Sequence, residues 1–209
     1  MLYFLFISLL IFIFFSMRLN KKSPGFCFSP IKIEKMQISR TKLTVFCGLL
    51  TSLTVLFKLS NIFSPGIGII VSPFAPLPIA MAAIFSPIGG IWTLTSSVAI
   101  IAMFSLPLAL VFLLSGGMMA LTLGTGIYYS RSRLFLILIS TLILTSGIVL
   151  LLYVFNIPFF GAFSKGFNPY LKFLFLGLYS LCYGLGWVFF IDIVVTKILR
   201  NIKNIYGRH

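Results

Sequence analysis

The chain has 209 residues, of which 60% are hydrophobic and only 9% are charged. Sixteen Lys and Arg residues stand against two acidic residues, so the formal net charge is +14. This composition has too few polar side chains to coat a water-soluble globule, and it predicts an integral membrane protein. The basic residues occur in short clusters between apolar runs, a pattern that indicates membrane topology and argues against a nucleic-acid partner.

The amino-terminal part contains a short apolar run at 2–17, followed by basic residues. No charge precedes this run and no small-residue cleavage motif follows it, so a secretory signal peptide is disfavoured. We expect residues 1–35 to be an N-terminal anchor joined to a basic cytoplasmic linker. In the alternative interpretation, Met36 is the true start. In both cases residues 36–209 form a six-helix transmembrane domain with a cytoplasmic C-terminal tail.

Six later apolar runs approach the roughly 20 residues that a helix needs to cross a bilayer. The predicted spans are 43–63, 66–86, 88–105, 107–128, 134–156 and 171–196. Ser and Pro occur together between the first four spans, and they favour the end of one helix and the first turn of the next. The predicted fold class is therefore all-α: a polytopic membrane helix bundle with six core transmembrane helices, plus a seventh at 2–17.

The positions of the basic residues predict the orientation of the spans. If six helices cross after Lys42, thirteen of the sixteen Lys and Arg residues share one side of the membrane. The other three, Lys58, Lys165 and Lys172, are then assigned to the opposite side. Because short cytoplasmic loops carry the excess of positive charge, the crowded side is the cytoplasm. We expect a multi-pass protein of the cell membrane with its C-terminus in the cytoplasm.

Catalytic and metal-binding motifs are missing from the sequence. It contains no nucleotide-binding glycine loop, no zinc-protease motif and no nucleophile elbow. The single histidine, His209, is the last residue, and Asp192 is the one carboxylate within the predicted spans. General acid–base catalysis needs positioned titratable groups. We therefore expect no enzyme activity, no catalytic residues, no cofactor and no metal site, and no energy-coupling site for transport.

Three prolines stand close together inside the second predicted span. Proline lacks an amide hydrogen, so Pro73, Pro76 and Pro78 would leave three carbonyl groups of a regular helix without donors. A membrane tolerates such carbonyls only where protein or water surrounds them. We predict a broken helix that faces the interior, with Ser72 and the three prolines facing a ligand, as broken helices do in transporters. A plain kink or a tight turn is the alternative.

The last predicted span carries a stripe of aromatic residues. Tyr179, Tyr183 and Trp187 are spaced four residues apart and so share one helix face. This face is suited to stacking a flat or cationic ligand, and it supplies the second set of ligand-facing candidates. Packing within the bundle or contact with lipid is the alternative.

Small residues and charges give two structural predictions. Gly116, Ala120 and Gly124 repeat at every fourth position, which predicts a face for close helix packing. Asp192 lies near the cytoplasmic end of the last span, where Arg131, Arg133 or Lys197 would neutralise it in an interfacial ion pair. A role of Asp192 in gating or partner contact is the alternative.

The overall layout resembles the YybS-like bacterial membrane proteins and, more distantly, the S-components of energy-coupling factor (ECF) transporters. The resemblance covers about residues 40–198 and rests on the basic leader, the proline-broken second span, the phrase FSPIGG at 85–90 and six spans with both ends inside. S-components capture a vitamin or a metal from outside and dock onto a separate transmembrane partner that carries ATPases. The resemblance places Gly48 and Ser52 at the small-residue docking pair of the first helix, where S-components have Ala.

Two functions are compatible with these features. The first is a substrate-capturing or permease-like transport subunit without its own energy-coupling site, whose partners are the lipid bilayer and an ATPase-bearing transmembrane complex. The second is a membrane scaffold or assembly factor with no transported solute. If the segment from Pro73 to Pro78 lines an enclosed polar or aromatic cavity, the first function is favoured, whereas a solidly packed interior favours the second.

Overall fold

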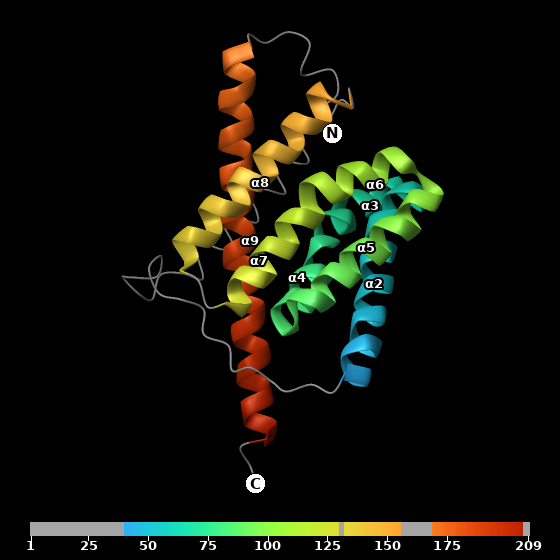
Figure 1. Ribbon diagram of the computed structural model, residues 1–209, viewed down its shortest axis with the longest axis vertical. Helices are drawn as coiled ribbons and strands as arrows, with labels where there is room; N and C mark the ends of the chain where they lie inside the picture. Colours follow the sequence, from blue (N-terminus) through green and yellow to red (C-terminus); the bar gives the residue numbers. More distant parts are fainter. Residues whose placement is uncertain (1–39, 130–131, 156–168, 207–209) are drawn as a thin grey trace.

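The computed structural model describes residues 40–129, 132–155 and 169–206, with side chains over 41–129, 132–155 and 175–194. The elements assigned within these ranges are all helical (Figure 1). They are α2 (Arg40–Phe63), α3 (Pro65–Val71), η1 (Ser72–Phe74), α4 (Pro76–Phe85), α5 (Pro87–Phe104), α6 (Leu106–Phe112), η2 (Leu113–Gly117), α7 (Met118–Tyr128), α8 (Arg133–Tyr153) and α9 (Pro169–Tyr206). The predicted N-terminal span at 2–17 and Arg131 lie outside the described residues.

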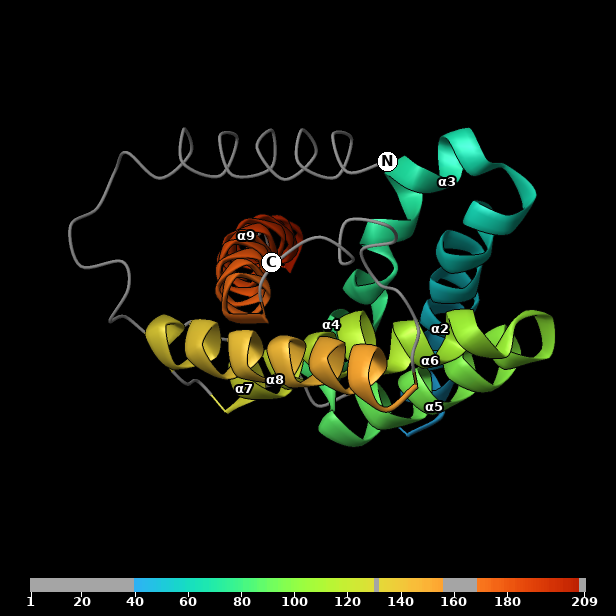
Figure 2. The same ribbon diagram turned by 90° about the horizontal axis from the view of Figure 1, so that it is seen from above.

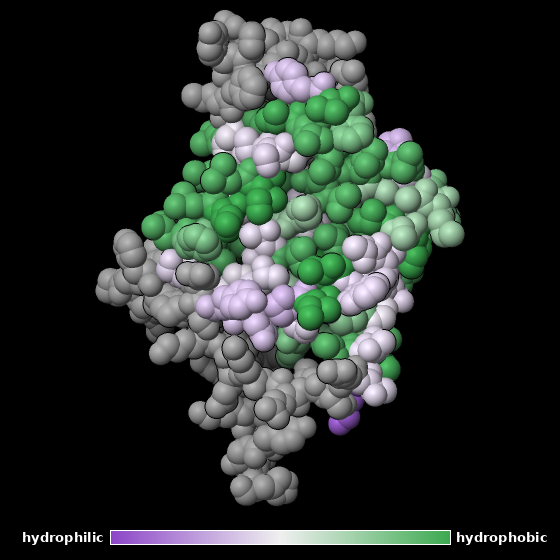
Figure 3. Space-filling view, viewed as in Figure 1, coloured by the Kyte–Doolittle hydropathy of each residue, from purple (hydrophilic) through white to green (hydrophobic). Residues whose placement is uncertain are grey.

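Six helical stretches of the described chain are long and apolar enough to cross a membrane. They are Thr41–Phe63, Pro65–Phe85, Pro87–Phe104, Leu106–Tyr128, Arg133–Tyr153 and Phe175–Val194. Each overlaps a predicted span. The ends of the first five differ from the prediction by at most three residues, and the sixth lies within α9, which begins at Pro169. The prediction of an all-α, multi-pass membrane helix bundle is confirmed. Figure 3 shows hydrophobic residues over most of the described surface in that view, as lipid contact requires.

Single serines connect the first four spans, and the side chains of Ser86 and Ser105, though not that of Ser64, cap the following helix. Ser86 Oγ accepts a hydrogen bond from the Gly89 amide at 3.3 Å, and Ser105 Oγ accepts one from the Leu108 amide at 3.4 Å. A proline occupies the first turn of each following helix, where its missing amide hydrogen does no harm. Connections this short make consecutive spans antiparallel neighbours.

The second span is broken where its prolines stand. α3 ends at Val71, the 3₁₀ turn η1 follows, and α4 begins at Pro76. The Ser72 carbonyl, to which Pro76 cannot donate, accepts instead from the Ala75 amide at 3.2 Å. This span has the largest buried share of the six, and Figure 2 shows α4 inside the bundle. The predicted broken, inward-facing helix is therefore present.

The fourth span is also irregular, and it packs against α4 through small residues. It runs through α6, the π-helical turn η2 and α7. A Cβ atom added to Gly124 would lie 2.5 Å from the Ala80 carbonyl oxygen, and one added to Gly116 would lie 2.9 Å from Pro76 Cγ. Ala120, between them, is 1% exposed. The small-residue face predicted for this span thus lies at its contact with α4.

The first and the last described helices begin and end on the same side of the bundle, as an even number of membrane crossings requires. In Figure 1 the start of α2, in blue, and the end of α9, in red, both point to the lower side. α8 also begins towards that side, while α3 and α6 lie near the upper side.

Candidate functional site

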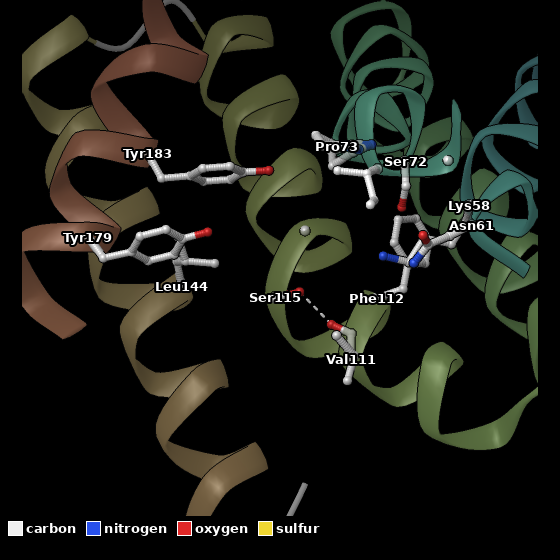
Figure 4. A pocket seen from close by; sticks show the side chains of 14 residues that line it. Lys58, Asn61, Ser72, Pro73, Val111, Phe112, Ser115, Leu144, Tyr179 and Tyr183 are labelled. Atoms are coloured by element: carbon white, nitrogen blue, oxygen red, sulfur yellow. Dashed lines mark hydrogen bonds between the residues drawn. The ribbon is translucent and has the colours of Figure 1, made fainter. Parts of the chain in front are cut away.

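A pocket of about 170 Å³ lies between the spans. Fourteen residues line it, and they come from α2, α3, η1, α4, α6, η2, α8 and α9. Polar side chains reach the pocket from six of the lining residues: Lys58, Asn61, Ser72, Ser115, Tyr179 and Tyr183. Figure 4 shows these side chains around the pocket.

The pocket is off-centre along the membrane-crossing direction. Lys58 and Asn61 fall in the last six residues of the first span, and Tyr179 and Tyr183 fall in the first half of the last span. At 1.5 Å per residue, Lys58 lies about 8 Å from the end of α2. These parts of the chain share the side of Ser105, the connection between the third and fourth spans. The pocket is therefore nearer to that side of the bundle.

The helix break supplies one wall of the pocket. Ser72 and Pro73 belong to the 3₁₀ turn, and Pro76 begins α4. Figure 4 shows Ser72 and Pro73 across the pocket from Tyr183. A 3₁₀ turn is tighter than an α-helical turn, so it redirects the chain at this point. Three of the four residues predicted from the proline cluster thus line the pocket.

The opposite wall carries two tyrosines of the predicted aromatic stripe. The Tyr179 and Tyr183 rings are stacked, with centroids 5.9 Å apart and planes inclined by 19°. Both side chains point from α9 towards the pocket, with their hydroxyl groups leading (Figure 4). The wall therefore presents two hydroxyl groups and the edges of two aromatic rings.

Pro78 and Trp187, two further ligand-facing candidates, are not among the residues that line the pocket. Pro78 is buried within α4. Trp187 is 3% exposed, and its ring packs between Tyr183 and Phe190, with centroids 6.3 and 5.7 Å away. Eight residues of α-helix separate Trp187 from Tyr179, a rise of about 12 Å. The i+8 position therefore shares the helix face but lies too far along the axis to reach the pocket.

Lys58 lies in the predicted first span and towards its outer end, but the sequence analysis did not identify it as a residue of the site. It lies within α2, half-buried, and its Nζ stands 5.5 Å from the centroid of the Phe112 ring. A charge at the centre of a spanning helix costs about 2.5–3.5 kcal/mol, and less near the interface. A cation–π contact offsets about 0.5–2 kcal/mol of this cost. One Lys inside an apolar run was the signal that could have identified it.

Asn61, Phe112 and Ser115 also line the pocket without having been predicted. Ser115 lies in the π-helical turn and donates a hydrogen bond to the Val111 carbonyl. π-helical turns inside α-helices occur frequently at functional sites. The Ser-Gly-Gly sequence at 115–117 interrupts the apolar run of this span and is the local signal for the irregular turn.

The structure pairs Asp192 with Arg133, away from the pocket. One guanidinium nitrogen of Arg133 lies 3.1 Å from each carboxylate oxygen of Asp192. The side chains are 13% and 11% exposed, so water screens the attraction only weakly. Since Arg133 begins α8 and Asp192 is near the end of the last span, the pair joins α8 to α9 at the end of the bundle opposite the pocket.

The proposed docking pair, Gly48 and Ser52, lies on an exposed face of α2. A Cβ atom added to Gly48 would meet no heavy atom of another helix within 4 Å among the described residues. Ser52 Oγ donates to the Gly48 carbonyl at 3.1 Å, which satisfies the hydroxyl without any neighbouring helix. This face therefore takes no part in the packing between the described helices.

The site thus consists of one pocket with hydroxyl, amide and ammonium groups on largely apolar walls. In the described part of the chain, no group of three or more His, Cys, Asp or Glu residues is placed to hold a metal ion. Comparisons of the chain with models of protein families, with curated proteins and with solved structures find no match.

Proposed function

We propose that this protein is the solute-binding subunit of a membrane transport system and that the pocket beside the helix break captures a small solute. The pocket is the observation that carries the proposal. Polar groups inside an apolar bundle are costly to bury and, in membranes, usually belong to substrate or ion pathways. The broken helix beside them is also typical of transporter binding sites.

The size of the pocket limits the solute. Its volume is about 170 Å³. An engineered protein cavity of about 150 Å³ admits benzene, whereas pockets for drug-sized ligands measure about 300–1,000 Å³. The part of the solute that lies within the pocket is therefore about the size of one ring with a small substituent.

The orientation favours capture from outside the cell. The positive-inside rule assigns the connections at Ser64 and Ser105 to the outer side of the cell membrane, and the pocket lies nearer to that side. A solute arriving from outside then reaches the pocket without crossing the full thickness of the bundle.

The energy for transport comes, in this proposal, from a separate transmembrane complex that carries ATPases. The sequence has no nucleotide-binding motif of its own. The exposed face around Gly48 and Ser52 is suited to close approach of a partner helix. This division of labour, and membership of the YybS-like proteins, follow from the resemblance in layout and remain predictions.

A scaffold or assembly factor is the second candidate, and the same exposed small-residue face of α2 favours it. Such a protein would need the face for its partners and would have no use for the pocket. The two candidates therefore differ in whether filling the pocket abolishes function.

A pocket-filling variant tests the proposal. Val111 lines the pocket, so Val111→Phe should fill much of it, whereas Ile100→Phe adds the same ring at an exposed position of α5. In nanodiscs, small solutes screened by thermal shift should stabilise the wild type and Ile100→Phe but not Val111→Phe. Equal responses from all three proteins, or function in cells that survives Val111→Phe, would favour the scaffold.

A further inference from the structure

Lys58 is a pocket cation for which the described chain supplies no counter-ion. The sequence has two acidic residues, Glu34 and Asp192. Glu34 lies outside the described residues, and Asp192 is paired with Arg133 at the opposite end of the bundle. The Phe112 ring, 5.5 Å from Lys58 Nζ, offers a partial negative charge only. The ammonium group of Lys58 therefore faces the pocket, and the contact with the Phe112 ring balances its charge only weakly.

Asn61 and Ser72, which lie beside Lys58 in the pocket, add hydrogen-bond donors and no negative charge. Asn61 lies one turn further along α2 and lines the same wall (Figure 4). An ammonium group has three donors and no acceptor, and a side-chain amide has two donors. A carboxylate accepts through both oxygens, so it can take hydrogen bonds from Lys58 and Asn61 together.

The rest of the pocket is complementary to an apolar group. Leu144 and the rings of Tyr179 and Tyr183 face Lys58 and Asn61 from the other side, and Pro73 and Val111 complete the walls between them. A ligand that filled this space would thus have a charged end at α2 and an apolar body towards α8 and α9. A compact inorganic anion would leave the apolar walls without contact.

We propose that the pocket binds a small organic anion, whose carboxylate pairs with Lys58 and Asn61 and whose apolar body lies against Leu144 and the two tyrosines. This inference rests on the proposed function and names the class of its solute. It also gives Lys58 a partner inside the spanning helix, because the bound anion supplies the missing counter-charge.

Three single-ring probes of nearly equal size separate charge from shape. Benzoate is an anion, benzyl alcohol is neutral, and benzylamine is a cation at pH 7. Their binding to the purified protein in nanodiscs is measured by ligand-observed NMR at constant ionic strength, with Val111→Phe as the background for partitioning into lipid. We expect benzoate to bind at least tenfold more tightly than benzyl alcohol, and benzylamine to show no binding above background.

Two substitutions at Lys58 locate the source of the selectivity. Lys58→Met keeps the length of the side chain without its charge, and Lys58→Gln keeps a polar group without the charge. Both variants should bind benzoate at least tenfold more weakly than the wild type. Their affinity for benzyl alcohol should stay within twofold of the wild-type value. Because each removes an uncompensated charge, the thermal unfolding midpoint without ligand should stay equal or rise. A midpoint that falls in both variants would show that Lys58 serves stability, and it would overturn the proposal.

The binding of the three probes separates an error in the anion assignment from an error in the proposed function. If benzyl alcohol or benzylamine binds as tightly as benzoate, or if both Lys58 variants keep the preference for benzoate, the anion assignment is wrong while a solute pocket remains. If no probe binds above the Val111→Phe background, both the anion assignment and the solute-binding function are contradicted.

Discussion

Asp192 and Arg133 neutralise each other where water has little access to either side chain. The guanidinium group lies 3.1 Å from both carboxylate oxygens and joins the start of α8 to α9. Lys58, at the other end of the bundle, has an aromatic ring as its neighbour instead. The two cations thus differ in their partners: Arg133 has a counter-ion within the chain, and Lys58 faces the pocket.

Asp192→Asn should destabilise the protein, because it leaves the Arg133 charge largely buried without its counter-ion. Breaking a buried pair in this way costs about 3–5 kcal/mol. Since each kcal/mol moves the midpoint by roughly 2–4 °C in chains of this size, we expect the thermal unfolding midpoint to fall on the order of 10 °C. The exchanged pair, Arg133→Asp with Asp192→Arg, should recover part of the loss. An unchanged midpoint in Asp192→Asn would show that the pair contributes little.

At the scale of elements, the two irregular spans lie against each other and form much of the pocket. The 3₁₀ turn η1 interrupts the second span, and the π-helical turn η2 interrupts the fourth. Pro76 of α4 contacts Gly116 closely enough that a Cβ atom there would lie 2.9 Å from its ring. Both irregular turns therefore occur where close helix packing holds them in place, and both supply pocket residues.

Gly124→Ala tests the packing of α7 against α4. The new methyl group would lie 2.5 Å from the Ala80 carbonyl oxygen, so the helices must separate. Overpacking of this kind costs about 1–3 kcal/mol, part of which the better helix propensity of Ala offsets, by up to about 1 kcal/mol. Gly48→Ala is the matched control, because its methyl group meets no other described helix and should leave stability equal or higher. Denaturation in detergent that ranks the two variants in the reverse order would refute this packing.

At the scale of the whole molecule, an even number of crossings after Lys42 determines which ends share a compartment. The described spans alternate in direction, so Ser132 and the end of α9 fall on one side and Ser105 falls on the other. The same alternation assigns the pocket to the side of Ser105. Capture of a solute from outside depends on this arrangement.

Cysteine labelling tests the arrangement directly. In a background where Cys27, Cys47 and Cys182 are replaced by Ala, Ser132→Cys and a cysteine at the C-terminus should resist a membrane-impermeant thiol reagent in intact cells and react after lysis. Ser105→Cys should react in intact cells. Labelling that places Ser132 and the C-terminus on opposite sides would contradict the topology and, with it, outward access to the pocket.

The membrane class, the six spans and the break in the second span all follow from the amino-acid sequence. These features depend on local properties: the length of each apolar run, the serine and proline between runs, and the missing amide hydrogens at Pro73, Pro76 and Pro78. The same local reasoning identified Asp192, the single carboxylate in the spans, and three candidate cations near its predicted end, and the structure shows that Arg133 is its partner.

Only the tertiary structure decided which side chains meet. Lipid is as apolar as the interior of the bundle, so the inward face of a spanning helix has no strong hydrophobic signature. The sequence therefore could not distinguish Tyr179, in the pocket, from Trp187, in the core, or show that Lys58 lies beside Phe112, 54 positions further along the chain. The pocket exists because eight elements bring distant residues together, and that arrangement depends on how small residues allow the helices to pack.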